Sequence, residues 1–502
     1  MMEKKHSETS RSIARNVLYG FSTFILPLGL SFLATPIIIA NLGLQNYGIF
    51  MLVLGFVGFS GIFSFSRSIT KYIAEFRSQG ENEKISDVIS VAFFINLAVG
   101  LVGVLIIWLT AEWLVSDVLK IEVEAREQSV IALYIVSLII FLAMVTQIWT
   151  AILQGIHRFD VYSNIFNLNN IAVLSGNILL ASFGFGILSL LVWNLSVTAI
   201  VCLIFAKSTK RLLPEFKLSL GLNTETLKLL AAFSAGNILY QIGSNLFLLF
   251  ERGWITRHFG AETLTYYVVP MTLALYIHGF IASLMVVIFP LASELRNDKE
   301  KLLRLYLTAT KTVCFFVVFL GTTLIVESRF FLTLWLGAEF ADKTALLLII
   351  HTITFSLLAV SPVSWQMTEG LGYTNYNCFL SVICFLISFL LMISLTESYG
   401  NLGIAVGRLT GFAIIFLSIF YVEKWFFGRV QREFWLKLLG VLAVSAFFSA
   451  TVETLIISNF ASSWMTFAAA NLGGGVIYCL VVWLLGFIEE DEKLLIRRIL
   501  IR

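Results

Sequence analysis

The stretch IAEFRSQGENEKI fills residues 73–85, and the stretch LASELRNDKEKLL fills residues 291–303. Each places Ala or Ser before Glu, then an apolar residue, then Arg and a polar run that ends in Glu-Lys. Three glycine-containing loops also recur at nearly the same distance along the chain, at offsets of 217, 215 and 216 residues: Gly43 with Gly260, Gly155 with Gly370, and Gly184 with Gly400. Chance likeness between short loops is the alternative, but four landmarks at one offset indicate that a structural unit occurs twice.

The composition is that of an integral membrane protein. Of the 502 residues, 58% are hydrophobic and only 13% are charged, whereas soluble domains carry about 25% charged residues. Five cysteines fall inside apolar runs without metal-binding or redox spacing, so we interpret them as small packing residues. The polar N-terminal sequence, followed by a full-length apolar run, does not resemble a cleavable signal peptide.

The apolar stretches predict an all-α membrane protein with 14 transmembrane helices. A spanning helix needs about 20 mostly apolar residues. Stretches that meet this requirement lie at 17–40, 47–73, 87–109, 128–153, 160–182, 185–206, 228–250, 264–290, 305–326, 344–367, 374–396, 401–423, 435–457 and 464–487.

The distribution of Lys and Arg orients these spans. With the N-terminus inside, the inner segments hold 26 of the 34 basic residues and the outer loops hold 6, and 2 lie within spans. Because cytoplasmic loops carry the excess of Lys and Arg, both termini are expected in the cytoplasm.

The repeat predicts two homologous six-helix bundles in the same orientation, made of spans 1–6 and 7–12, plus two C-terminal helices. The expected parts are an N-terminal lobe (1–206), a cytoplasmic linker (207–227), a C-terminal lobe (228–425), and two further helices with a tail (426–502). Two such bundles can rock around a central cleft, which is how many transporters give alternating access. The linker is basic and partly amphipathic, so it could lie along the inner surface as a flexible strap.

Polar residues at helical spacing indicate which span faces line this cleft. Span 2 carries Ser60, Ser64, Arg67 and Lys71, and span 7 carries Ser234, Asn237, Gln241 and Asn245. For both we favour a cavity lining over interhelical hydrogen bonding. For the stripe of span 5, which runs from Ser163 to Asn177, we favour interhelical contact.

The embedded charge is positive. Spans 1–12 hold no acidic residue well inside the membrane, whereas Arg67 and Arg408 lie within spans. Snorkelling to an interface is the alternative for these arginines and for Lys71, and a place at a span end is enough to explain Arg252. The cationic cleft favours an anion, and a forked guanidinium suits phosphate. The predicted substrate-binding residues are Arg67, Lys71, Ser64, Asn237, Gln241, Asn245, Arg252 and Arg408.

Several stretches, in this order, resemble the polysaccharide-biosynthesis flippases of the multidrug/oligosaccharidyl-lipid/polysaccharide exporter superfamily. They are RSIARNVLYG (11–20), LGLQNYGIF (42–50), LQGIHRFD (153–160), FPLASEL (289–295) and LTLWLGAEF (332–340). The resemblance implies two six-helix lobes in a V-shaped arrangement. It also implies transport of undecaprenyl-diphosphate-linked sugar repeat units across the bacterial cytoplasmic (inner) membrane. The expected partners are this lipid-linked oligosaccharide, membrane lipid and a glycan polymerase machinery.

Other classes of function fit less well. The outer loops are small, and the sequence lacks a GxxxxGK[ST] loop, a metal cluster and a Ser/His/Asp arrangement. We therefore expect no enzyme activity, no catalytic residue, no cofactor, no metal and no nucleic-acid partner. His278 and His351 are interpreted as packing residues, with a proton relay as the alternative. A peptidoglycan-precursor flippase and a multidrug/cation antiporter of the same superfamily remain alternative functions.

Overall fold

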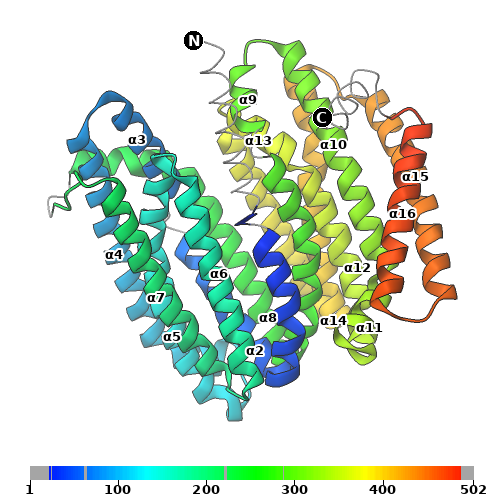
Figure 1. Ribbon diagram of the computed structural model, residues 1–502, viewed down its shortest axis with the longest axis horizontal. Coiled ribbons are helices and arrows are strands. Elements are labelled where there is room, and N and C mark those ends of the chain that lie inside the picture. The colour runs from blue at the N-terminus through cyan, green and yellow to red at the C-terminus, as the bar shows by residue number, and fades with distance from the viewer. Residues whose placement is uncertain (1–21, 24, 62–64, 220–222, 286–287, 488–502) are drawn as a thin grey trace. The chain divides into compact units, whose positions relative to one another are not determined.

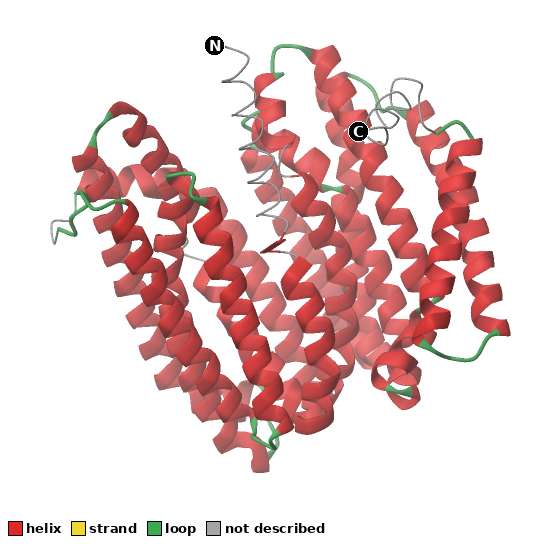
Figure 2. Cartoon of the chain, in the orientation of Figure 1, coloured by secondary structure: helices red, strands yellow, loops and turns green. Residues whose placement is uncertain are grey.

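The computed structural model describes residues 22–23, 25–61, 65–219, 223–285 and 288–487. In these ranges the regular elements are helices, with no β-strand (Figure 2). A helix over Ile25–Leu42 is followed by α2 (Leu44–Gly55), the 3₁₀ segment η1 (Phe56–Gly61), α3 (Ser66–Gln79), α4 (Asn82–Trp113), the π-helical turn η2 (Leu114–Val118), α5 (Val123–Gly155), α6 (Phe159–Ser182) and α7 (Ile187–Leu212). The chain continues with α8 (Thr224–Met285), α9 (Ile288–Glu294), α10 (Lys299–Val326), α11 (Ser328–Leu336), α12 (Ala338–Val360), α13 (Pro362–Gly370), α14 (Thr374–Phe427), α15 (Arg432–Asn459) and α16 (Trp464–Leu484).

The chain forms two compact units, Met1–Thr265 and Tyr266–Arg502. The division falls inside α8, after a glycine that interrupts its helical geometry. Each unit is described by itself. The boundaries of the lobes and linker drawn from the sequence, at 206, 227 and 425, remain predictions.

Twelve of the described helical segments are long and apolar enough to cross a membrane. This confirms an all-helical, multi-pass membrane protein. The count differs from fourteen because α8 and α14 each cover two predicted spans. Each contains one residue with non-helical dihedral angles, Gly260 (φ 82°, ψ 169°) and Gly400 (φ 58°, ψ −140°). At 1.5 Å per residue, the 54 residues of α14 would extend about 80 Å, well beyond the roughly 30 Å of a hydrocarbon core.

The two stretches quoted first both form a helix, a loop and the start of a second helix. In the first, Gly80 (φ 75°) ends α3, and the amide of Glu81 donates to the carbonyl of Phe76 at 3.0 Å, as in a Schellman motif. In the second, the Asp298 carboxylate caps α10 by accepting from the amide of Lys301 at 3.1 Å. The two similar sequences therefore form the same local helix–loop–helix pattern but close their loops by different contacts.

Left-handed backbone conformations recur along the chain. Eight of the described residues with positive φ pair at offsets of 215–217 residues: Gly43 with Gly260, Lys120 with Gly337, His157 with Gly372, and Gly184 with Gly400, whereas Gly80, Gly428 and Gly486 have no such counterpart. Gly43 has φ 78° and ψ 161°, close to the angles of Gly260. Non-glycine residues rarely adopt positive φ. Lys120 and His157 nevertheless do so at the positions that match Gly337 and Gly372, so the distribution of glycine alone does not explain the recurrence.

Span 2, predicted over 47–73 as one helix, is interrupted. The α-helix stops at Gly55, and the sequence FVGFSG of η1 continues with 3₁₀ geometry. Glycines lower helix stability and allow a backbone change of this kind. Residues beyond the interruption therefore do not continue the helical register of the residues before it.

The linker predicted at 207–227 is held against α4. The amides of Lys217 and Ser219 donate to the hydroxyls of Ser86 and Ser90, at 3.2 and 3.0 Å. The side-chain amide of Asn223 donates to Asp87 at 2.9 Å. Because residues 86 and 90 lie one turn apart, this part of the linker follows the first turns of α4.

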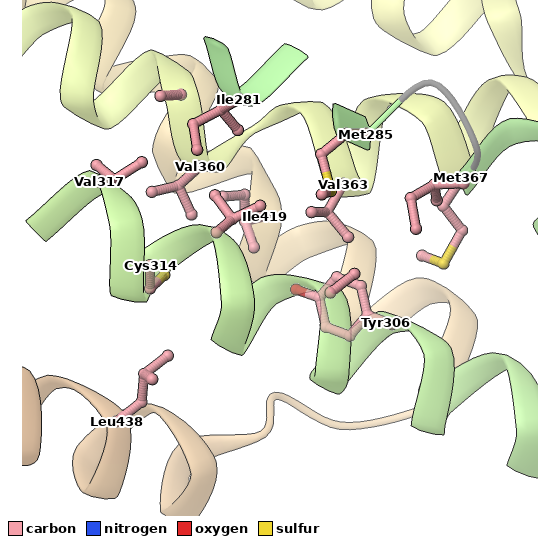
Figure 3. Close-up of a cluster of buried hydrophobic side chains, with 14 of the residues drawn as sticks. Ile281, Met285, Tyr306, Cys314, Val317, Val360, Val363, Met367, Ile419 and Leu438 are labelled. Atoms are coloured by element: carbon pink, nitrogen blue, oxygen red, sulfur yellow. The ribbon is translucent and has the colours of Figure 1, made fainter. Parts of the chain in front are cut away.

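A buried apolar cluster forms the core of each unit. In the first unit it combines α3, α4, α5, α6 and α7 with the start of α8, and includes Ile73, Ile89, Ile152, Phe205 and Leu230. In the second unit it joins α8, α9, α10, α12, α13 and α14 to the C-terminal pair α15 and α16 (Figure 3). That pair runs side by side along α10 (Figure 1).

Candidate functional site

The helix α3 exposes Arg67 and Lys71, one turn apart, on one face. Its opposite face is buried and carries Ser68, Ile69, Tyr72 and Ile73. The Nζ atom of Lys71 lies 4.7 Å from the centre of the Tyr72 ring, which is within cation–π range. The polar face thus presents two basic side chains, and Glu75 follows one turn later toward the end of the helix.

Ser60 belongs to a different environment from these basic residues. It is 7% exposed and accepts a hydrogen bond from Nε2 of Gln147 at 3.3 Å. The stripe predicted from Ser60 to Lys71 assumed an unbroken α-helix, whereas Ser60 lies in the 3₁₀ segment η1. The predicted site residue Ser64 lies outside the described residues.

The predicted polar stripe of span 7 packs against η1 within the first unit. Gln241 and Asn245 are half-buried, and Asn245 donates to the carbonyl of Gln241 at 2.8 Å. A Cβ atom placed on Gly58 would lie 2.1 Å from Oδ1 of Asn245, so only glycine lets α8 approach this closely. The side chain of Asn237, also predicted in the site, lies outside the described part of the chain.

Arg252 continues the same face of α8. Its side chain is 8% exposed, and its guanidinium donates to the carbonyl oxygen of Met51. A Cβ atom on Gly55 would lie 2.8 Å from Nη1 of this arginine. Arg252 therefore joins α8 to α2, which is a contact between helices. Ser234, at the start of the stripe, likewise shares a 2.8 Å hydrogen bond with Ser68 of α3.

Arg408 lies in the second unit and is buried, at 4% exposure. Its guanidinium carbon stands 5.7 Å from the ring centre of Phe355 and 5.4 Å from that of Phe412. The buried imidazole of His351 packs edge-on to Tyr267 at 4.7 Å. A delocalised, weakly hydrated guanidinium suits such an aromatic setting.

The structure also reveals buried carboxylates that the sequence did not place in a site. Glu423 is fully buried and accepts hydrogen bonds from the Tyr306 hydroxyl at 2.8 Å, the Trp435 indole at 2.6 Å and the amide of Gln431 at 2.8 Å. Glu327 and Glu453 are buried near the opposite end of α10. Sequence alone offered one signal for these two: Thr323 and Ser449 precede them by one helical turn. Among the described residues, no group of three or more His, Cys, Asp or Glu side chains is placed to hold a metal ion.

These features define a multi-helix membrane protein, and solved structures show which fold it has. The chain superposes on the lipid II flippase MurJ in an inward closed conformation with a TM-score of 0.77, over 97% of this chain and all of that one, at 17% identity. It also superposes on an inward-facing multidrug resistance MATE family transporter of the MOP superfamily, with a TM-score of 0.61, over 82% of this chain and 94% of that one, at 15% identity. At these identities the likeness shows a shared fold.

Sequence comparison identifies the family. A family model described as "Polysaccharide biosynthesis protein" matches residues 41–345, more than half of the chain. The chain therefore belongs to the polysaccharide biosynthesis protein family, as its motifs indicated. A curated relative from Shigella flexneri, described as "Putative O-antigen transporter", is 22% identical over 406 residues, covering 79% of this chain and 94% of the relative.

Proposed function

We propose that the protein flips an undecaprenyl-diphosphate-linked oligosaccharide repeat unit across the cytoplasmic membrane by alternating access. The unit would then be assembled into a surface polysaccharide such as O-antigen, capsule or exopolysaccharide. The observation that carries the proposal is the family match, together with the alignment over 94% of a relative described as an O-antigen transporter. The cargo, its orientation and a polymerase partner are parts of the proposal.

Two observations support an arrangement of fourteen spans in two equivalent lobes. Dividing α8 at Gly260 and α14 at Gly400 turns the twelve candidate spans into fourteen. Left-handed residues pair at offsets of 215–217 along the two predicted lobes. Parallel repeats of this kind place a cargo site between lobes and expose it to alternate sides.

The charge on α3 supports an anionic cargo. Arg67 and Lys71 project from the exposed face of a helix that continues a predicted span. A charge at membrane depth costs at least about 2.5–3.5 kcal/mol and usually faces protein or a water-filled cavity. A pyrophosphate would offset this cost, and arginine can bind it through two parallel hydrogen bonds. We propose that Arg67 binds one phosphate group of the pyrophosphate and that Lys71 pairs with the negative charge of the other.

The remaining predicted residues have more modest proposed roles. Gln241 and Asn245 are half-buried. We assign contact with sugar hydroxyls only to the exposed part of each side chain. Arg252 and Arg408 are buried, and in the described structure their contacts are with protein. For these two we favour a structural role, with substrate contact limited to a conformation that uncovers them.

A peptidoglycan-precursor flippase is the second candidate, because the TM-score to MurJ over 97% of the chain exceeds that to the MATE transporter. Complementation separates the candidates. The gene should restore surface glycan to a strain that lacks its own repeat-unit flippase. Rescue of a strain depleted of its peptidoglycan-precursor flippase, or of a drug-sensitive strain, without restored glycan would overturn the proposed cargo.

A further inference from the structure

Two buried carboxylates lie close to one another in the second unit. Glu327 follows the last residue of α10, and Glu453 belongs to the final third of α15. Their exposures are 1% and 0%. α10 packs against both α15 and α16, so the two side chains lie where three helices meet.

Neutral groups surround these carboxylates in two layers. The hydroxyls of Thr323 and Ser449 donate to Oε1 of Glu453, at 2.8 and 3.1 Å. The side-chain amide of Asn471 donates to Oε2 of Glu327 at 2.7 Å. Thr323, which contacts Glu453, precedes Glu327 by four residues. The contacts around Glu453 and those around Glu327 are therefore about one helical turn apart.

Each carboxylate keeps one oxygen without a hydrogen bond. Oε1 of Glu327 and Oε2 of Glu453 are buried and have no partner among the described residues. The helix α16 closes over Glu453 with a glycine, since a Cβ atom on Gly474 would lie 2.3 Å from Oε1. The protein therefore packs closely around the carboxylates but leaves two acceptor atoms without a hydrogen bond. Buried acceptors of this kind lower the stability of the folded state.

The surrounding charges do not neutralise this pair. α16 contains no charged residue, and the other charged residues of α15 (Arg432, Glu433 and Lys437) are near its opposite end. On the adjoining helices α11 and α12, Arg329 pairs with Asp342 at 2.7 Å and Lys343 pairs with Glu339 at 2.9 Å, all exposed. Burial, reinforced by the charge of Glu453 and opposed by the hydrogen bond from Asn471, raises the pKa of Glu327 to about 7.

We propose that Glu327 and Glu453 form a binding site for one small monovalent cation, a proton or Na⁺, held by their two unused oxygens. Two buried charges of the same sign cannot both persist without compensation, and one bound cation reduces the net charge from two to one. Asn471 and the hydroxyls of Thr323 and Ser449 orient the carboxylates. The inference concerns cation binding and does not depend on which cargo the protein carries.

Thermal unfolding of the purified full-length protein tests the site. The measurement uses NaCl or N-methyl-D-glucamine chloride of equal ionic strength, at pH 5.5 and pH 8. If Na⁺ binds, NaCl should raise the unfolding temperature at pH 8 by at least about 2 °C. If only a proton binds, the unfolding temperature should fall between pH 5.5 and pH 8 in both salts. The sign follows because the folded state holds the Glu327 proton to about pH 7, above the ordinary pKa of 4.5, so stability falls as pH rises between these values.

Matched variants assign either response to the pair. Glu327→Gln and Glu453→Gln should each abolish it, whereas Glu433→Gln, an exposed carboxylate on the same helix as Glu453, should keep it. Infrared spectra give a second readout: wild type should show a protonated carboxyl band at pH 6 that weakens in Glu327→Gln. The proposal is overturned if both Gln variants retain the wild-type response to salt and pH, or if wild type shows no response and no such band.

Discussion

Arg67 and Arg408, which the sequence predicted within spans, have very different surroundings in the structure. Arg408 is surrounded by aromatic rings and is almost inaccessible, while Arg67 stands on an exposed helical face with Lys71. The sequence predicted both within membrane spans, so it did not distinguish their surroundings. Only the exposed arginine can meet a cargo without prior rearrangement, and the proposed pyrophosphate contact depends on it.

Substitution of Arg67 should follow the chemistry of a phosphate contact. A hydrogen bond to a charged group contributes about 1.5–3 kcal/mol, so Arg67→Ala should reduce transport about tenfold or more. Arg67→Lys keeps the charge but loses the fork and should be partly active, and Arg67→Glu should be inactive. Surface glycan in a complemented deletion strain, normalised to protein level, provides the measurement.

The control for this series is Lys84→Glu, which changes an exposed basic residue paired with Glu81 at 2.8 Å. It should leave glycan at the wild-type amount. If Arg67→Glu is expressed normally and also restores full glycan, Arg67 is a snorkelling residue, and the pyrophosphate contact is wrong.

Glu423 illustrates a buried charge with a structural role. Its carboxylate accepts three hydrogen bonds that join α10, α14 and α15. Glu423→Ala would leave buried donors unsatisfied, so we expect a loss of about 3 kcal/mol in the free energy of unfolding. Glu423→Gln retains an acceptor and should cost less.

Denaturant unfolding of the purified variants measures this difference. The matched control is Glu397→Ala, an exposed glutamate on the same helix, which should stay within about 0.5 kcal/mol of wild type. Equal stability of Glu423→Ala and wild type would show that this network contributes nothing.

At the level of elements, close packing in the first unit depends on glycines at the junction of α2 and η1. In a membrane, lipid tails are as apolar as side chains, so helices associate through tight packing and polar contacts. Gly55 and Gly58 admit Arg252 and Asn245 of α8 at distances where a Cβ atom would clash. The same element therefore interrupts span 2 and provides the surface on which α8 packs.

Gly58→Ala should consequently destabilise the protein by about 1–3 kcal/mol, as expected for overpacking. Gly103→Ala is the matched control, because a Cβ atom there would meet nothing within 4 Å. Removing the clashing side chain in the double variant Gly58→Ala/Asn245→Ala should recover part of the loss. Thermal unfolding in detergent follows all three, and equal unfolding temperatures for the two Gly→Ala variants would refute the packing argument.

Most elements were predictable because each depends on its own residues. Apolar length placed nearly every helix, and Gly-containing loops marked their ends. The interruption at η1 was missed because Val57, Phe59 and the neighbouring glycines are as apolar as the helix before them, so hydropathy does not distinguish 3₁₀ from α geometry. The contacts of the linker with Ser86 and Ser90 could not be predicted, because they join residues about 130 positions apart in the sequence.

The site was less predictable than the fold. The sequence placed Arg67 and Lys71 on one stripe, and the structure exposes both on one face of α3. The polar stripe of α8 has the same composition as a cavity lining, yet its contacts with η1 depend on glycines almost 200 residues away. Burial of Glu327 and Glu453 likewise arises from the packing of three helices, which the Thr or Ser one turn before each of them does not by itself indicate.

At the scale of the whole molecule, the excess of basic residues in alternate loops predicts the topology. In a cysteine-free background, Gln79→Cys, Glu215→Cys and Glu300→Cys should resist an impermeant maleimide applied to intact cells. Glu124→Cys and Glu262→Cys should react, because their loops are expected outside. Permeabilised cells serve as the control, in which all five must react. Labelling of Glu215→Cys from outside would contradict both the cytoplasmic linker and the proposed lobes.

The most direct test of the central claim is transbilayer movement of the cargo in proteoliposomes. The purified protein is reconstituted with undecaprenyl-diphosphate-linked oligosaccharide, and an added glycosidase reports how much sugar reaches the outer leaflet. We predict that wild-type protein renders nearly all of the oligosaccharide accessible, that Arg67→Glu leaves the inner-leaflet half protected, and that Lys84→Glu behaves as wild type. Protection equal to that in protein-free liposomes, with wild-type protein correctly folded, would contradict the claim that this protein is a flippase for lipid-linked oligosaccharides.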